Sequence, residues 1–244
     1  MALIDVVDLS ISIGENVILD HANLSVEEGQ TVILSGDNGS GKSTLLKAIF
    51  GERNGLKIKG DIRYRGNEIA SRDFDLQNYR KRIGYVPQED SFCEETPFKE
   101  ACYSYELHCG TRDEDYINNL FDKFGIPYLK NKKLFSKRGP QLSGGEKKMV
   151  ALIATLCRKN SDLFLIDEPL NNLDAKNVRT ISNMINSIHE NNPKAGVLIV
   201  THCHALPRIN KQYQITQKKI EPIVDEYKCF NCFGPVDENG FYRF

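Results

Sequence analysis

Hydrophobic residues in this chain fall into short continuous runs separated by longer segments of helical period. The runs at 31–34, 163–166 and 197–200 are apolar or β-branched throughout and stop at polar or turn residues, which predicts strands buried on both faces. Between the last two runs, apolar residues recur at helical spacing over 178–188. Strand, helix and strand in this order predict a right-handed parallel crossover, and therefore an α/β fold.

A second pattern surrounds the first buried run. Polar and apolar residues alternate over 3–13 and again over 58–64, and two short apolar stretches lie within 17–26. Alternation of this kind is typical of antiparallel strands with one exposed face. The N-terminal part of the chain is therefore expected to add an antiparallel β subdomain to the parallel core.

The pattern changes again after Glu89. Helices are predicted at 98–108 and 113–124 with no strand between them, and a further helix is predicted to begin at Ser143. We therefore expect a helical lobe inserted into the main one. The expected division is a main catalytic lobe at 1–88 and 146–223, a helical lobe at 89–145, and a C-terminal tail at 224–244.

Charge and cysteine content exclude some classes of function. Lys plus Arg is 32 against 33 for Asp plus Glu, a net charge of −1, so we expect no nucleic acid partner. No apolar run approaches the length of a membrane span, and the first residues lack the pattern of a secretion signal. The seven cysteines are odd in number and scattered, which favours a reducing, cytoplasmic location.

The chemistry of the chain centres on the segment that follows the first buried run. Gly36, Gly41, Lys42 and Ser43 fill the pattern G-x-x-x-x-G-K-[ST] between a predicted strand and a predicted helix. Glycines let backbone N–H groups face phosphate oxygens, and the helix N-terminus adds partial positive charge. Lys42 is expected to bridge the β- and γ-phosphates, and the Ser43 hydroxyl to bind Mg²⁺. The expected ATP-binding residues are Gly36, Asp37, Asn38, Gly39, Ser40, Gly41, Lys42, Ser43 and Thr44.

Two further stretches carry a family resemblance. Leu142-Ser143-Gly144-Gly145-Glu146 precedes a buried strand that ends in Asp167-Glu168-Pro169. With the phosphate loop, they resemble the nucleotide-binding domain of the ATP-binding cassette (ABC) family over about 3–223. The resemblance implies a P-loop NTPase core with a mostly parallel sheet, an antiparallel β subdomain and a helical subdomain.

The resemblance also implies catalytic roles. Asp167 would hold Mg²⁺ through water, and Glu168 would be the general base that polarises the attacking water. Gln88 matches a glutamine that senses Mg²⁺ and this water, and His202 matches a histidine that contacts the γ-phosphate. From the residues alone, a solvated acidic strand end and a structural histidine are the alternatives.

A second subunit is implied as well. In the family, Ser143, Gly144, Gly145 and Glu146 complete the ATP site of an opposing nucleotide-binding subunit, so that two ATP molecules lie between two such domains. Asp174 stands in a loop that reaches the partner, and it also suits the N-cap of the next helix. Ser143 and Glu146 have capping-box spacing.

The chain departs from the family pattern at several positions. Ile13 stands where an aromatic residue usually stacks on adenine, so base recognition is expected to be weak. Met149 replaces a common arginine, and the Glu-Arg-Gly element of exporters is matched only in part by 137–139. The tail contains Cys229 and Cys232 with no second pair nearby, so incidental cysteines are favoured over a zinc site, and its aromatic residues suggest a docking patch.

We expect this chain to be the ATPase subunit of an ABC transporter whose membrane permease is a separate polypeptide. It would then be cytoplasmic and attached peripherally to the membrane through the permease, with ATP and Mg²⁺ as cofactors. The alternative is a soluble ABC ATPase that switches a non-membrane partner in cluster assembly, translation or DNA repair. A small-molecule kinase is disfavoured by the Leu142–Glu146 pentapeptide.

Overall fold

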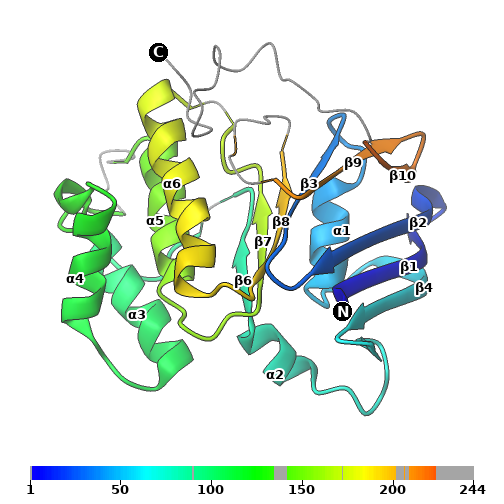
Figure 1. The fold of residues 1–244 in the computed structure, drawn as a ribbon, viewed down its shortest axis with the longest axis horizontal. Helices are drawn as coiled ribbons and strands as arrows, with labels where there is room; N and C mark the ends of the chain where they lie inside the picture. The colour runs from blue at the N-terminus through cyan, green and yellow to red at the C-terminus, as the bar shows by residue number, and fades with distance from the viewer. Residues whose placement is uncertain are drawn as a thin grey trace.

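The fold is built around a six-stranded sheet with the strand order β10-β9-β3-β8-β7-β6 (Figure 1). The computed structural model describes residues 2–89, 91–134, 142–171, 173–201, 206 and 209–223. Neighbouring strands run parallel, except that β10 pairs antiparallel with β9. The predicted α/β class with a mostly parallel sheet is confirmed. The strands are β3 (Thr31–Gly36), β6 (Ile83–Val86), β7 (Leu163–Asp167), β8 (Gly196–Val200), β9 (Lys211–Thr216) and β10 (Lys219–Pro222).

The central strands supply side chains to two hydrophobic clusters, one on each face of the sheet. Every residue of β3, β7 and β8 is buried. Because successive side chains point to opposite faces, Ile33 of β3 packs on the helical side and its neighbours Val32 and Leu34 pack on the other side. This explains why the sequence of these strands is continuously apolar instead of alternating.

A second, antiparallel sheet covers one face of the central sheet together with helix α1 (Lys42–Ile49) (Figure 1). Where the sequence suggested two short stretches, the structure has one twelve-residue strand, β2. The register of β1 against β2 shifts several times, and Asp8 and His21 adopt positive φ there. These irregularities interrupt the apolar pattern without ending the strand. The strands are β1 (Ala2–Ile13), β2 (Asn16–Glu27), β4 (Leu56–Tyr64) and β5 (Asn67–Glu68), in the order β2-β1-β4-β5.

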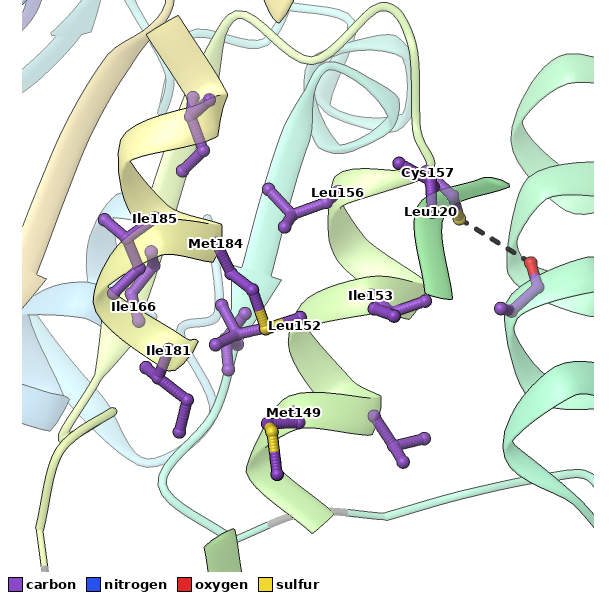
Figure 2. Close-up of a cluster of buried hydrophobic side chains, with 14 of the residues drawn as sticks. Leu120, Met149, Leu152, Ile153, Leu156, Cys157, Ile166, Ile181, Met184 and Ile185 are labelled. Atoms are coloured by element: carbon purple, nitrogen blue, oxygen red, sulfur yellow. Dashed lines mark hydrogen bonds between the residues drawn. The ribbon is translucent and has the colours of Figure 1, made fainter. Parts of the chain in front are cut away.

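Helices cover the opposite face. Figure 2 shows α5 (Gly144–Leu156) packed against α6 (Ala175–Asn191), with Leu152 of α5 beside Met184 of α6. Helices α3 (Pro97–Cys109) and α4 (Glu114–Lys123) lie beyond α5, followed by the 3₁₀ turn Pro127–Leu129, and α2 (Leu76–Lys81) precedes β6 (Figure 1). None of the helices in the described ranges combines the length and apolar character needed to cross a bilayer.

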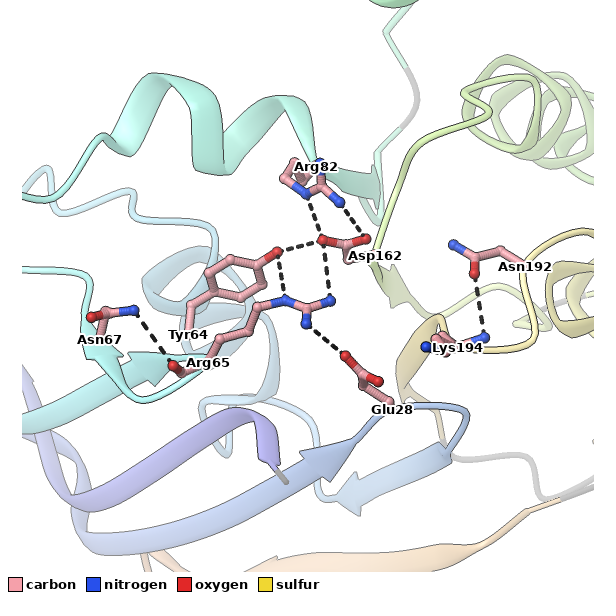
Figure 3. A network of polar contacts seen from close by, with 8 residues as sticks. All are labelled: Glu28, Tyr64, Arg65, Asn67, Arg82, Asp162, Asn192 and Lys194. Carbon is pink, nitrogen blue, oxygen red and sulfur yellow. Dashed lines mark hydrogen bonds and ion pairs between the residues drawn. The ribbon is translucent and has the colours of Figure 1, made fainter.

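Asp162, just before β7, joins the antiparallel sheet to the central one (Figure 3). Its carboxylate accepts two hydrogen bonds from the guanidinium of Arg82 and one from the Tyr64 hydroxyl, and Arg65 lies 3.6 Å away. Arg65 in turn pairs with Glu28 at 2.6 Å. Burial opposes ionisation of Asp162, but the hydrogen bonds from Arg82 and Tyr64 lower its pKa below the usual value.

Asp162→Asn is expected to lower the free energy of unfolding by about 1–3 kcal/mol near neutral pH, because Arg82 loses its charged acceptor. The pKa of Asp162 is lower in the folded than in the unfolded chain. Its stabilising contribution is therefore complete above about pH 4 and is lost as the pH falls through the lower, folded-state pKa. Urea unfolding at neutral pH and near pH 3 should show the difference between wild type and variant shrinking in acid.

The matched control for this prediction is Glu28→Gln, at the solvent-exposed end of the same network. The side chain of Glu28 is 34% exposed, against 12% for Asp162, and an exposed ion pair contributes only about 0–1 kcal/mol. Equal losses for the two variants, or a difference that does not change with pH, would contradict the central role of Asp162.

Candidate functional site

The candidate site lies at the carboxyl ends of the parallel strands. Gly36 ends β3, Asp167 ends β7, and Lys42 begins the helix that follows the phosphate loop. Open α/β sheets bind their ligands at this edge. The structure therefore brings the predicted phosphate loop and the predicted acidic pair to one place.

Glycine is required at two positions of the phosphate loop. Gly36 and Gly41 have φ of 148° and 103°. A Cβ at Gly41 would lie 2.5 Å from Ile18 of β2, and one at Gly36 would lie 2.9 Å from the Ser40 hydroxyl. The loop thus turns back tightly against β2, while Asp37, Asn38 and Gly39 at its tip remain exposed and Ser40 and Thr44 are half-buried.

The Lys42 ammonium is buried at the centre of this loop. It donates hydrogen bonds to the carbonyl oxygens of Gly36 at 2.7 Å and Asp37 at 2.9 Å, and it lies 3.9 Å from Glu168 Oε1. Burial lowers the pKa of Lys42, and the negative charges of Glu168, Asp167 and Asp37 oppose that shift. A cation therefore stands within the loop, where phosphate groups would need charge neutralisation.

Asp167 is suited to hold a divalent cation. Its side chain is buried, and its Oδ1 atom has no hydrogen-bond partner among the described residues. Burial raises the pKa of Asp167, while a hydrogen bond from Ser43 and the positive charges of Lys148, Lys42 and Lys47 oppose the shift. A buried carboxylate oxygen without a partner, beside a serine hydroxyl, matches the oxygen ligands that Mg²⁺ prefers.

Glu168 lies directly after β7 in a strained conformation. Its φ is 48°, the left-handed region that non-glycine residues seldom adopt. The backbone N–H of Glu168 donates to the carbonyl oxygen of Val200 at 2.8 Å, which fixes this turn. The two neighbouring carboxylates differ in environment, since Asp167 contacts Ser43 and Glu168 faces Lys42.

Gln88 follows β6 and its side chain is exposed. The backbone there is held by Lys148 of α5, whose ammonium donates to the carbonyl oxygens of Pro87 at 2.8 Å and Gln88 at 3.1 Å. Sequence reasoning missed Lys148. A lysine on an amphipathic helix usually reads as a solvated side chain, yet only 7% of Lys148 is exposed.

The pentapeptide forms the N-terminus of α5. The predicted capping box is confirmed, with the Glu146 N–H donating to the Ser143 hydroxyl and the Ser143 N–H donating to the Glu146 carboxylate. Lys132 binds the same carboxylate at 2.6 Å. Ser143 and Gly144 are exposed, and a Cβ at Gly144 would meet no atom within 4 Å. This helix end is therefore open to a ligand or partner.

Gly145 is buried where α5 meets α6. A Cβ at Gly145 would lie 2.6 Å from Asn177 and 3.1 Å from Leu173. Asp174 caps α6, as predicted, by accepting a hydrogen bond from the Asn177 N–H at 2.8 Å. The loop before α6 is thus packed beside the pentapeptide.

Some predictions fall on residues outside the described ranges. These are the γ-phosphate contact of His202, the element at 137–139, and the cysteines and aromatic residues of the tail. Ile13, at the end of β1, is 49% exposed. That Ile13 lies over the adenine base stays a prediction.

A pocket of about 470 Å³ adjoins the phosphate loop. It is lined by the loop tip, by the start of β2, and by the β9–β10 hairpin, which the sequence reading did not predict. Ile13 is not among the lining residues, and none of them is aromatic. They are Asn16, Val17, Ile18, Asp37, Asn38, Gly39, Ser40, Gln214, Ile215, Thr216, Gln217 and Lys218.

Comparisons with known proteins agree with this geometry. A family model described as ABC transporter matches residues 19–171, more than half of the chain. An ABC transporter ATP-binding protein of Caldanaerobacter subterraneus is 37% identical over 68% of this chain and 67% of its own length. The zinc transport system ATP-binding protein AdcC of Streptococcus pneumoniae is 29% identical over 98% and 97%.

A solved structure of the ATP-binding subunit of an ABC transporter superposes with a TM-score of 0.71, covering 89% of this chain and 88% of that one at 24% identity. That likeness shows the same fold. The phosphate loop, the Asp167-Glu168 strand end and the pentapeptide helix all lie within residues 19–171, which the family model matches. Together with the family match, they establish that the chain belongs to the ABC transporter family as one of its ATP-binding domains.

Proposed function

We propose that this chain hydrolyses ATP and that the hydrolysis powers the movement of a substrate through a membrane permease on a separate chain. The observation that carries the proposal is the buried arrangement of Lys42, Asp167 and Glu168 at one sheet edge. A cation, a candidate metal ligand and a candidate base, placed beside a glycine-rich loop, are the parts that phosphoryl transfer needs.

Each part has a proposed task. The backbone of Gly36–Thr44 and the Lys42 ammonium bind the phosphates of ATP. Ser43 and Asp167 hold Mg²⁺, which when bound would neutralise charge on the phosphate oxygens. Glu168 accepts a proton from the attacking water, because its carboxylate sits beside Lys42 at the site. Gln88 and His202 would orient that water and contact the γ-phosphate.

A second nucleotide-binding subunit completes the proposed site. The exposed N-terminus of α5, at Ser143 and Gly144, places the partial positive charge of a helix end at the surface, which suits a phosphate from an opposing subunit. Three neighbouring residues hold this helix end in place. Gly145 packs against α6, Glu146 accepts a hydrogen bond from Ser143, and Asp174 caps α6. The two subunits would associate around ATP and separate after hydrolysis. Movement of the helical lobe, 89–145, against 1–88 and 146–223 would carry that change.

The permease would dock on a groove of about 530 Å³ between α2 and α3. Leu76 and Leu107 supply apolar surface to the groove, and Leu107 is 67% exposed. Arg80, His108 and Arg158 supply its polar surface. The relatives named as ATP-binding proteins of transport systems support a membrane partner. The chain would then lie on the cytoplasmic face of the membrane.

The test pairs this chain with the membrane-spanning product of a neighbouring reading frame. We expect the two to copurify in detergent, and Leu107→Glu to reduce the recovered permease about tenfold, because a carboxylate replaces an exposed apolar contact. Tyr128→Ser is the control, since Tyr128 is 49% exposed but does not line the groove.

Release of phosphate from ATP by the purified chain, without an added acceptor, tests the enzymatic part separately. An active ATPase with which no membrane-spanning protein copurifies would contradict transport and favour a soluble switch. If Leu107→Glu and Tyr128→Ser lose the permease equally, the groove is not its docking site.

A further inference from the structure

The structure contains a buried cation that the proposed mechanism does not use. Lys148 lies on the second turn of α5 with 7% of its surface exposed. Its ammonium donates to two successive carbonyl oxygens, those of Pro87 and Gln88. Burying an ammonium is unfavourable unless hydrogen bonds compensate for the lost water, so this contact is a specific one.

These two bonds join residues that are 61 and 60 positions apart in the sequence. One segment is the end of β6, where Pro87 and Gln88 leave the central sheet. The other is α5, which begins immediately after Ser143. Lys148 therefore ties the backbone of Gln88 to the helix whose N-terminus is the exposed pentapeptide.

Two successive carbonyls directed at one ammonium fix the orientation of the peptide between Pro87 and Gln88. The direction in which the Gln88 side chain leaves the backbone depends on that orientation. Pro87 has no backbone N–H and restricts φ, so the Lys148 ammonium holds this turn through carbonyl oxygens. The side chain of Gln88 is exposed, and Lys148 holds the backbone to which it is attached through the Gln88 carbonyl oxygen.

We propose that Lys148 is a positioning residue that aims Gln88 at the ATP site and couples Gln88 to the pentapeptide end of α5. The proposal rests on the proposed ATP hydrolysis and on the role of Gln88 in it. Lysine suits the task because its ammonium has three donors and can serve two carbonyl oxygens at once. The next residue, Met149, is buried in the core and cannot substitute.

The first test compares Lys148→Met, which keeps the length of the side chain, with Lys148→Arg, which keeps the charge and the donors. We expect Lys148→Met to lower kcat for ATP hydrolysis about tenfold or more, with KM for ATP within about threefold of wild type, because Lys42 and the phosphate loop keep their own contacts. Lys148→Arg should recover most of the lost rate. Lys123→Met, which removes an exposed lysine on α4, is the control and should change neither value.

A double-variant cycle separates positioning from general destabilisation. If Lys148 acts through Gln88, the combined Gln88→Ala and Lys148→Met chain should be no slower than Gln88→Ala alone. If the rate losses of the two single variants multiply in the combined variant, the proposal is overturned. An unchanged kcat in Lys148→Met would overturn it as well. Should Lys148→Met fail to fold, Lys148→Gln, which keeps an N–H donor, takes its place.

Hydrogen exchange tests the contact without requiring turnover. In Lys148→Met, a peptide covering residues 84–89 should exchange about tenfold faster, while peptides from β3 and α1 should stay unchanged. Unchanged exchange at 84–89 would overturn the proposal even in an active enzyme. Wild-type protein that binds ATP but releases no phosphate would instead contradict the proposed function, and the exchange result would still decide the role of Lys148.

Discussion

Lys42→Ala is expected to abolish tight ATP binding. The ammonium is the buried cation of the phosphate loop, where it donates hydrogen bonds to the carbonyl oxygens of Gly36 and Asp37. Its removal takes away the charge that would neutralise the β- and γ-phosphates. We expect an affinity loss of at least about tenfold, or about 1.4 kcal/mol, in equilibrium binding with Mg²⁺.

Lys47→Ala is the matched control for this experiment. Lys47 lies on the same helix and is exposed, and it acts on the site only as a more distant positive charge near Asp167. Its removal should leave ATP affinity within about threefold of wild type. Binding by Lys42→Ala that also stays within this range would show that the phosphate site is misassigned.

Glu168→Gln is expected to separate binding from turnover. The amide keeps the size of the side chain and can occupy the same strained turn, whose N–H donates to Val200. It cannot accept a proton from water at neutral pH. The rate of phosphate release should fall by about 10²–10⁴, the usual contribution of a general base, while ATP affinity is retained. The variant should also accumulate as an ATP-bound dimer in size-exclusion chromatography.

Glu190→Gln provides the control for Glu168→Gln, because Glu190 is an exposed residue of α6 that pairs with Lys123 at the surface. Its turnover should match wild type. If Glu168→Gln hydrolyses ATP at the normal rate, another group is the base, and Asp167 would be the next residue to examine.

Much of the fold was predictable because its signals are local. Helix caps use residues three apart, so Ser143 and Asp174 could be recognised from the sequence, and the structure has both as N-caps. The buried strands were predictable because both faces are apolar. The lobes, in contrast, stay a proposal, since no observation on the described residues divides the chain at 88 and 146.

The missed elements depend on distant partners. Strand β9 is held by pairing with β3, which lies far away in the sequence, and its own alternation is limited to Tyr213 and Ile215. In the site, the motifs located Lys42, Asp167 and Glu168, because their spacing is fixed by a single strand end or loop. Lys148 was missed because its partners, at the end of β6, cannot be inferred from its neighbours on α5.

The left-handed backbone of Glu168 has a consequence for how this protein can be improved or can evolve. Glycine or asparagine would adopt this conformation at a saving of about 1 kcal/mol. Selection for thermostability alone would therefore favour replacing the residue proposed as the base, and selection for turnover would restore glutamate. Natural sequences retain such conflicts where activity requires them. A consensus or stability-guided redesign of this chain should hold position 168 fixed, even though the backbone there favours a different amino acid.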